Sequence, residues 1–118
     1  MNKKHLRQKA KIERQKLTSK EIEEKSLAIA NNLLRLDIWN KTYYHLFLPI
    51  VEQNEVNTEF VLQILAGKDK EIVISKSDFD TREMSHFSLT DTTKIVKNKY
   101  NIPEPINGLP VYTEMIDV

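Results

Sequence analysis

The sequence has 118 residues, of which 40% are hydrophobic and 30% charged, and it carries a net charge of +1 at pH 7. This length fits a single domain over residues 1–118, and no apolar run approaches the roughly 20 residues of a membrane-spanning helix. The sequence contains no cysteine, which excludes disulfides and thiolate metal sites, and its first residues lack the apolar core of a signal peptide. We therefore expect a cytoplasmic protein that makes no contact with a membrane.

Positive charge is concentrated at the amino terminus. Residues 1–20 hold eight Lys or Arg residues and one Glu, so the rest of the chain is net negative by six charges. Residues 2–16 lack Gly and Pro and consist mainly of strong helix formers, which predicts a helix with only a thin apolar stripe. Such a helix could hold the phosphates of a nucleotide or a nucleic acid, or could be a solvated face balanced by the acidic remainder.

A second helix is predicted over residues 19–36. Thr18 and Glu21 have the spacing of a capping box, in which each side chain accepts a hydrogen bond from the backbone of the other residue. The apolar residues of the segment recur at helical spacing, at Ile22, Ile29, Leu33 and Leu36. This helix should therefore belong to the core, and together with the first it predicts an amino-terminal helical hairpin.

A βαβ unit is predicted next. The aromatic and apolar residues 42–48 predict a strand that ends at Pro49, because proline cannot donate to a sheet. Asn57 or Thr58 is expected to cap a short helix that ends at Gly67. The β-branched residues 70–75 predict a second strand, parallel to the first. Ligands commonly bind outside the carboxyl ends of such strands, although these residues are equally typical of a plain helix start.

The remainder of the chain predicts shorter elements. Residues 83–89 alternate weakly and predict a further strand, whereas the two prolines of residues 100–105 predict a rigid extended loop. Residues 116–118 are typical of the opening of another strand, with no helix after it to cover the sheet. We therefore expect an α/β three-layer sandwich with a mostly parallel sheet flanked by helices, and with its C-terminal part missing.

Three segments, in this order and spacing, carry a family resemblance. They are Lys4-His5-Leu6-Arg7, the stretch from Phe47-Leu48 to Glu55-Val56-Asn57-Thr58, and Tyr100-Asn101-Ile102-Pro103-Glu104-Pro105. They resemble the 5-formyltetrahydrofolate cyclo-ligase family, also called methenyltetrahydrofolate synthetase. That family has a basic Lys-x-x-Leu-Arg start, a Glu-hydrophobic-x-Thr segment after its first strand, and an aromatic-Asn-Ile-Pro-x-Pro segment. The resemblance covers essentially this whole chain but not the family's later Gly-, Arg- and Tyr-rich segment.

The resemblance implies ATP-dependent, Mg²⁺-assisted ring closure of 5-formyltetrahydrofolate to 5,10-methenyltetrahydrofolate in one-carbon folate metabolism. Transfer of the γ-phosphoryl group to the formyl oxygen creates a leaving group, and the neighbouring folate nitrogen then attacks. The implied partners are the folate and ATP, with no nucleic acid, in a monomer or weak homo-oligomer. We expect little activity from a truncated chain.

The resemblance also implies site residues. ATP would be bound by the basic start of the chain, at Lys3, Lys4, His5, Leu6 and Arg7, because phosphoryl transfer needs cations near the phosphates. The folate would be bound by Leu48, Glu55, Met84 and Tyr100. A carboxylate suits the N–H donors of a pterin edge. Met84 and Tyr100 could instead pack in the core, and the loop between Leu48 and Glu55 is longer than we expect in many family members.

Some chemistry stays unassigned. No catalytic residue is identified, and no protein metal site is expected. His45 and His86 have no partner at metal-ligand spacing in the sequence, so neither is assigned to metal binding or base catalysis. Two alternative functions are a nucleic-acid-binding module that uses the basic first helix and a non-catalytic folate-binding fragment. The first lacks a recognition motif, and its aromatic residues are not interleaved with the basic ones.

Overall fold

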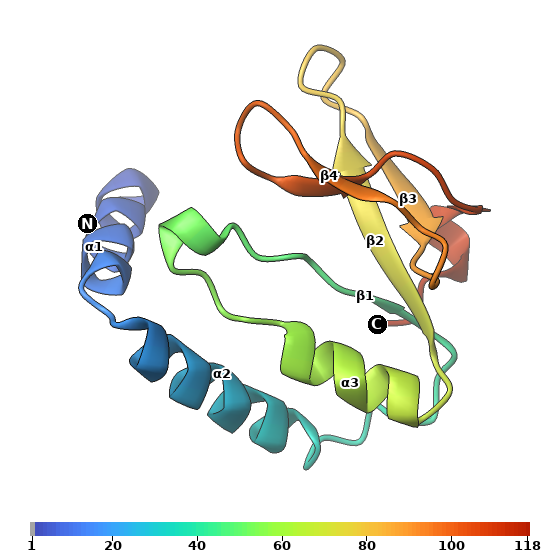
Figure 1. The fold of residues 1–118 in the computed structure, drawn as a ribbon, viewed down its shortest axis with the longest axis horizontal. Helices are drawn as coiled ribbons and strands as arrows, with labels where there is room; N and C mark the ends of the chain where they lie inside the picture. The colour runs from blue at the N-terminus through green and yellow to red at the C-terminus, as the bar shows by residue number, and fades with distance from the viewer. Residues whose placement is uncertain (1) are drawn as a thin grey trace.

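The computed structural model describes residues 2–118 (Figure 1). Its α-helices are α1 (Lys3–Gln15), α2 (Ser19–Leu33) and α3 (Glu59–Gly67), and its 3₁₀ helices are η1 (Val51–Gln53) and η2 (Thr113–Met115). Its strands are β1 (Tyr43–His45), β2 (Glu71–Ser77), β3 (Met84–Ser88), β4 (Ile95–Lys97), β5 (Pro103–Pro105) and β6 (Pro110–Val111). Among the helices of residues 2–118, none is long and apolar enough to span a lipid bilayer.

The main sheet has four strands in the order β1-β2-β3-β6. β1 and β2 are parallel, whereas β2 with β3 and β3 with β6 are antiparallel, so the prediction of a mostly parallel sheet is wrong. The reason lies in the polar segment 78–83 between β2 and β3. A parallel connection needs about a dozen residues or more, so a segment this short joins antiparallel strands. β4 and β5 form a separate antiparallel pair.

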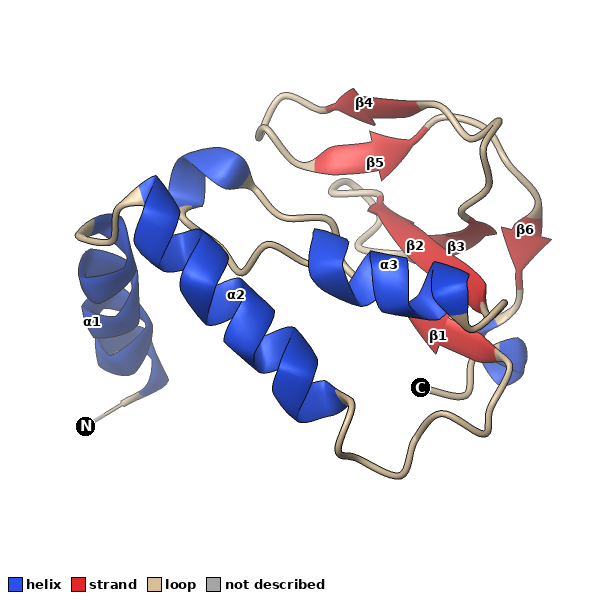
Figure 2. Cartoon of the chain, turned by 60° about the horizontal axis from the view of Figure 1, so that its bottom comes forward, coloured by secondary structure: helices blue, strands red, loops and turns tan. Residues whose placement is uncertain are grey.

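The predicted βαβ unit is confirmed. β1, α3 and β2 follow one another, and Tyr44 lies opposite Ile72 in a parallel register. Val61 and Leu65 of α3 are buried in a core cluster with these two residues, and Ala30 of α2 joins it. Figure 2 shows α3 in front of β1 and β2 with α2 beside α3, so α3 covers one face of the sheet and α2 packs at its side. The described part of the chain shows no second helical layer on the opposite face.

The amino-terminal helices follow the prediction in part. Thr18 and Glu21 each accept a hydrogen bond from the other's backbone N–H at 3.1 Å, which confirms the predicted capping box. α2 ends at Leu33, before the predicted end at Leu36. None of the residues of α1 is buried, in keeping with its thin apolar stripe. Figure 2 shows α1 and α2 diverging from their connecting turn, so the predicted hairpin is open.

The proline-rich segment is more regular than predicted. Instead of an irregular loop, Pro103–Pro105 forms β5, which pairs with β4. The prolines lie two residues apart, so both occupy strand positions that donate no hydrogen bond to β4. The pair is closed by hydrogen bonds of 3.0 Å from Ile106 N–H to the Lys94 carbonyl and from Asn98 N–H to the Ile102 carbonyl.

Residues 117 and 118 lie beside β1, at its free edge (Figure 1). Val118 N–H donates to the Tyr43 carbonyl at 3.2 Å, and His45 N–H donates to the Val118 carbonyl at 2.7 Å. These bonds have the pattern of parallel pairing, although no regular strand is formed there. The Asp117 carboxylate also accepts from the N–H groups of Thr42 and Tyr43, and these two bonds lower the pKa of Asp117.

Candidate substrate pocket

A pocket of about 430 Å³ opens at the point where the chain leaves β1 and turns towards α3. We call it the main pocket. Its lining comes from the start of α2, from the loop between β1 and α3, and from the first turns of α3, and it includes Leu48 and Glu55. The structure therefore brings together the two loop residues for which the sequence predicts a substrate contact.

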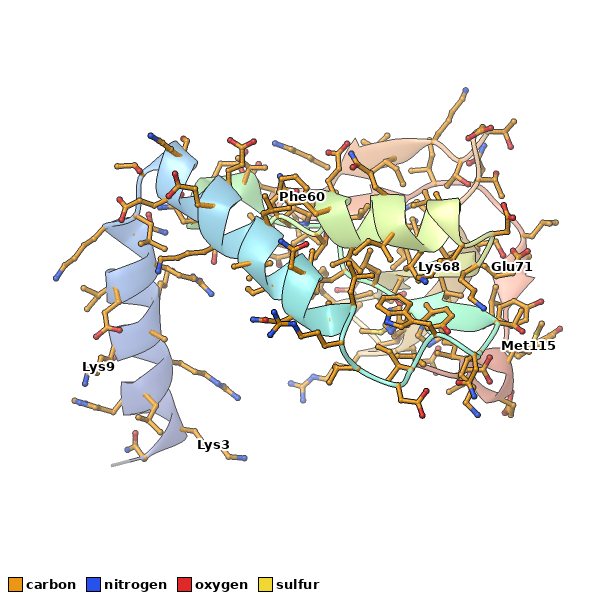
Figure 3. All side chains as sticks on the ribbon, turned by 90° about the horizontal axis from the view of Figure 1, so that it is seen from below. Lys3, Lys9, Phe60, Lys68, Glu71 and Met115 are labelled. Atoms are coloured by element: carbon orange, nitrogen blue, oxygen red, sulfur yellow. The ribbon has the colours of Figure 1, made fainter. Side chains whose placement is uncertain are left out.

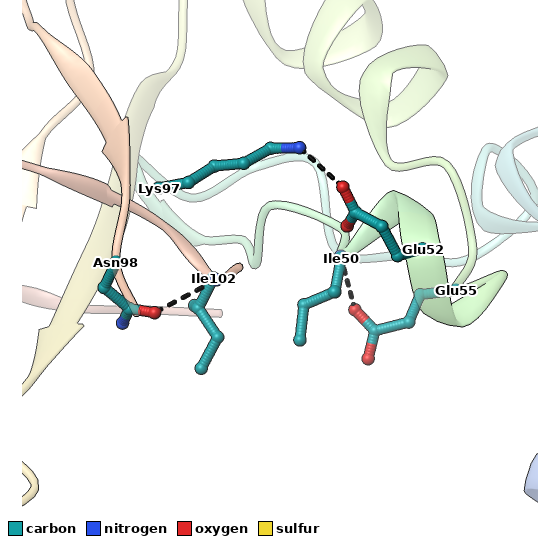
Figure 4. Close-up of polar contacts among 6 residues, drawn as sticks. All are labelled: Ile50, Glu52, Glu55, Lys97, Asn98 and Ile102. Atoms are coloured by element: carbon teal, nitrogen blue, oxygen red, sulfur yellow. Dashed lines mark hydrogen bonds and ion pairs between the residues drawn. The ribbon is translucent and has the colours of Figure 1, made fainter. Parts of the chain in front are cut away.

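The loop that carries Glu55 is folded onto itself. Oε1 of Glu55 accepts a hydrogen bond of 2.7 Å from Ile50 N–H, as Figure 4 shows. Asn54 adopts the left-handed conformation with φ of 52°, which Asn tolerates better than most residues. Its Nδ2 donates to the carbonyls of Arg14 and Leu17, at 2.9 and 3.2 Å. The loop is thus tied to the end of α1.

The far end of the loop is held by buried hydroxyl groups. Thr58 is buried, and its Oγ1 donates to the Phe47 carbonyl at 2.7 Å. Asn57 N–H donates to Oγ of the buried Ser26 in α2 at 2.8 Å. Of the two expected caps, Thr58 makes no side-chain hydrogen bond to α3, whereas Oδ1 of Asn57 accepts from Glu59 N–H at 3.0 Å. The Thr58 hydroxyl instead fixes the end of β1 against the start of α3.

An ion pair connects the loop to the β4–β5 pair. Lys97 Nζ lies 2.7 Å from Glu52 Oε1 (Figure 4), and this hydrogen bond is the main cause of the lowered pKa of Glu52. Next to Lys97, Oδ1 of Asn98 accepts from the N–H groups of Tyr100 and Ile102, at 2.8 and 3.2 Å. The turn that carries Tyr100 is therefore held by one side chain.

The other predicted folate residues lie elsewhere. A second pocket of about 190 Å³, which we call the side pocket, is lined in part by Met84 and again by Leu48. Leu48 thus belongs to both pockets. Tyr100 lines neither of them, because its ring packs against that of Phe79 with 4.7 Å between centroids, and about half of each residue is exposed. The structure brings Leu48 together with Glu55 and with Met84, but leaves Tyr100 outside both pockets.

The predicted ATP residues, Lys3 to Arg7, occupy the first two turns of α1 and are all exposed. Asn2 caps the helix by accepting from His5 N–H at 2.8 Å. Figure 3 shows Lys3 at the outer end of α1, away from the rest of the chain. α1 meets the loop at its other end, through the carbonyl of Arg14. Residues 3–7 therefore do not line the main pocket.

The sequence matches no protein-family model and no curated protein. It does match a solved structure, the NMR structure of 5,10-methenyltetrahydrofolate synthetase from Aquifex aeolicus. The TM-score is 0.78 at 25% sequence identity, over 99% of this chain. This chain has the methenyltetrahydrofolate synthetase fold. The resemblance inferred from the three sequence segments is therefore confirmed. The chain spans 58% of the length of the synthetase structure.

One polar group in this synthetase fold was missed by the sequence reasoning. Ser75 of β2 lies between His45 of β1 and His86 of β3, with its Oγ 2.6 Å from His45 Nε2 and 2.7 Å from His86 Nδ1. His45 is separated by 30 residues from Ser75, which itself lies 11 residues before His86. Only the registers of the parallel and antiparallel strand pairs bring the three together, and the sequence predicts those registers only loosely.

Metal ligands are sparse in this synthetase fold. Residues 2–118 contain no group of three or more His, Cys, Asp or Glu side chains that could surround one ion. The described side chains therefore offer no complete protein cage for a metal.

Proposed function

We propose that this chain binds 5-formyltetrahydrofolate and takes part in its ATP-dependent ring closure to 5,10-methenyltetrahydrofolate. One observation carries the proposal. Leu48 and Glu55, the residues that the family resemblance assigns to the folate, line one pocket in a chain with the synthetase fold. An apolar cavity with a few convergent polar groups is the usual form of a small-molecule site.

Glu55 is proposed to recognise the pterin ring. Its carboxylate is half-buried, and the hydrogen bond from Ile50 N–H holds Oε1 in place. Oε2 is then oriented as an acceptor for the N–H donors at the pterin edge, and charge-assisted hydrogen bonds of this type are stronger than neutral ones. Leu48 supplies an apolar wall beside it.

Met84 and Tyr100 are proposed to contact parts of the folate beyond the pterin. Met84 shares the side pocket with Leu48, so a ligand that crosses Leu48 would reach both pockets. Tyr100 and Phe79 form an exposed aromatic pair on which a flat ring could stack. Lys99, with its Nζ 5.3 Å from the centre of the Tyr100 ring, adds a positive charge for the acidic tail of the folate.

ATP is proposed to bind with its phosphates towards the start of α1. Lys3, Lys4 and Arg7 supply cations there, and the N-terminus of a helix favours anions as well. α1 is tied to the Glu55 loop at its last turn, so the loop and the basic helix form one connected unit. Transfer of the γ-phosphoryl group to the formyl oxygen would then activate the carbon that the folate nitrogen attacks.

Mg²⁺ is proposed to arrive on the triphosphate. Mg²⁺ usually keeps several waters and is held by phosphates together with one or two carboxylates. In this proposal the phosphates supply most of the ligands of the ion, and the protein need add only one or two carboxylates.

Calorimetry of the chain with 5-formyltetrahydrofolate tests the proposal. Glu55→Gln keeps the size of the side chain but removes its charge, and the loss of a charge-assisted hydrogen bond should weaken binding about tenfold or more. Glu71→Gln is the matched control, because Glu71 is an exposed residue at the start of β2, far along the strand from the main pocket (Figure 3). Equal binding by E55Q and E71Q, or no binding by the unaltered chain, would contradict the proposal.

A further inference from the structure

His45, Ser75 and His86 form a continuous polar row across three adjacent strands. Ser75 lies opposite His86 in the antiparallel register, and His45 lies opposite Val73 in the parallel one. The two imidazole rings meet edge to face, with 5.3 Å between centroids and 77° between planes. Both hydrogen bonds to the Ser75 hydroxyl are short, at 2.6 and 2.7 Å.

The hydroxyl of Ser75 couples the tautomers of the two rings. A hydroxyl has one hydrogen and two lone pairs, so it can donate to one imidazole while it accepts from the other. If it donates to Nδ1 of His86, then Nε2 of His45 must carry a proton, and both rings are Nε2–H tautomers. If it donates to Nε2 of His45, then Nδ1 of His86 carries the proton, and both rings are Nδ1–H tautomers. In both of these arrangements the two rings share one tautomer, whereas a hydroxyl that accepted from both rings would leave their tautomers different.

This coupling allows a proton to cross the row. A proton that binds Nδ1 of His45 lets its Nε2 proton move to Ser75. The Ser75 hydrogen moves to Nδ1 of His86, and Nε2 of His86 releases its own proton. Each group is left neutral, and both rings have changed from the Nε2–H tautomer to the Nδ1–H tautomer. One proton enters at His45 and one leaves at His86.

The two ends of the row face different cavities. His45 lines the side pocket, together with Leu48 and Met84, and among the described residues that line this pocket it is the only titratable side chain. His86 lines a third pocket of about 460 Å³, formed with β6 and η2. The two pockets share Met84 as a lining residue, so the two ends of the row open into adjacent spaces.

The surroundings favour a single charge on the row. Partial burial, and next the charge of His86, lower the pKa of His45, so two protonated rings are disfavoured. The pocket of His86 also contains Tyr112 and Glu114, and Lys76 follows Ser75 on β2. The Asp117 carboxylate is bound to the backbone at the start of β1.

We propose that His45, Ser75 and His86 form a proton relay that accepts the proton lost when the folate ring closes. This inference rests on the proposed function. In that reaction the folate nitrogen forms a bond to the formyl carbon, which ATP has activated by phosphorylating its oxygen. The carbon–oxygen bond breaks, and its electron pair leaves with phosphate. The hydrogen on the attacking nitrogen passes to Nδ1 of His45 and leaves through Ser75 and His86.

Nitrogen-15 NMR of the histidine side chains tests the relay without any turnover. In the unaltered chain, His45 and His86 should show the same tautomer at every pH at which both rings are neutral. Ser75→Ala should break this agreement, whereas Ser85→Ala, on the neighbouring strand, should leave it unchanged. His86→Gln should raise the pKa of His45, because it removes the repelling charge. Tautomers that differ in the unaltered chain, or that stay matched in S75A, would overturn the relay.

The rate of methenyltetrahydrofolate formation with ATP and Mg²⁺ tests its role in ring closure. Removal of a positioned proton acceptor typically slows a reaction by about 100-fold or more, so the maximal rate of H45Q at saturating folate should fall by at least that much. H86Q and S75A should change the pH profile of the rate. An H45Q rate equal to that of the unaltered chain would overturn the role of His45. If the unaltered chain neither binds folate nor forms product, the proposed function fails, and with it the role in ring closure, while the tautomer measurement still decides the relay.

Discussion

Asn54 provides the sharpest test of how the Glu55 loop is built. Its side chain donates to the Arg14 and Leu17 carbonyls at 2.9 and 3.2 Å, and its backbone is left-handed, with φ of 52°. Asn54→Ala removes both hydrogen bonds and places a less tolerant residue in the strained conformation. Asn54→Gly also removes the bonds but accepts that conformation without strain.

The expected cost follows from these two contributions. Each lost hydrogen bond destabilises the fold by about 1 kcal/mol, and the left-handed conformation costs an ordinary L-residue about 1 kcal/mol more. Asn54→Ala should therefore lower the free energy of unfolding by about 3 kcal/mol, and Asn54→Gly by about 2 kcal/mol. At about 4 °C per kcal/mol for a domain of this size, the melting temperatures should fall by about 12 and 8 °C.

Thermal and urea unfolding followed by circular dichroism measure both variants. The difference between them isolates the backbone strain, and the shared loss isolates the two hydrogen bonds. If both variants unfold within about 0.5 kcal/mol of the unaltered chain, a range typical of neutral surface changes, the tether between α1 and the loop does not contribute to stability. Equal losses in the two variants would mean that the left-handed backbone stores no strain.

Three further predictions concern the same surroundings. Thr58→Val removes the buried hydroxyl that donates to the Phe47 carbonyl, so urea unfolding should show a loss of about 1 kcal/mol. Lys97→Met breaks an ion pair whose side chains are 52% and 48% exposed, so the melting temperature should change little, and any difference should vanish at high salt. Because the pKa of His45 is lowered from 6.5, the folded state binds its proton less readily than the unfolded state. Unfolding titrations should therefore show stability falling as the pH drops below about 6.5, and less so in His45→Gln.

Local signals in the sequence predicted the elements that depend on local chemistry. The capping box of Thr18 and Glu21, the start of α3 after Thr58, and the parallel pairing of β1 with β2 all follow from neighbouring residues or from a single crossover. The family resemblance likewise rested on short segments, and the structural match confirms it at the level of the fold.

The errors arose at one short turn and at contacts between segments that are distant in the sequence. The direction of β3 depends on a short turn, and the pairing of β5 depends on which side of the strand its two prolines occupy. In the sequence, His45 and His86 are isolated strand residues and give no sign of a shared site. Only the strand register places Ser75 between them. The hydroxyl of Thr58 bonds to the strand instead of the helix, because the loop returns over the end of β1.

The most direct test of the account is conversion of 5-formyltetrahydrofolate in the presence of ATP and Mg²⁺, followed by the absorbance of 5,10-methenyltetrahydrofolate. We predict an increase in absorbance that requires ATP, however slow, and that Glu55→Gln reduces about tenfold or more while Glu71→Gln does not. An increase that is equal with and without ATP, or one that E55Q leaves unchanged, would contradict the assignment of the main pocket to the folate.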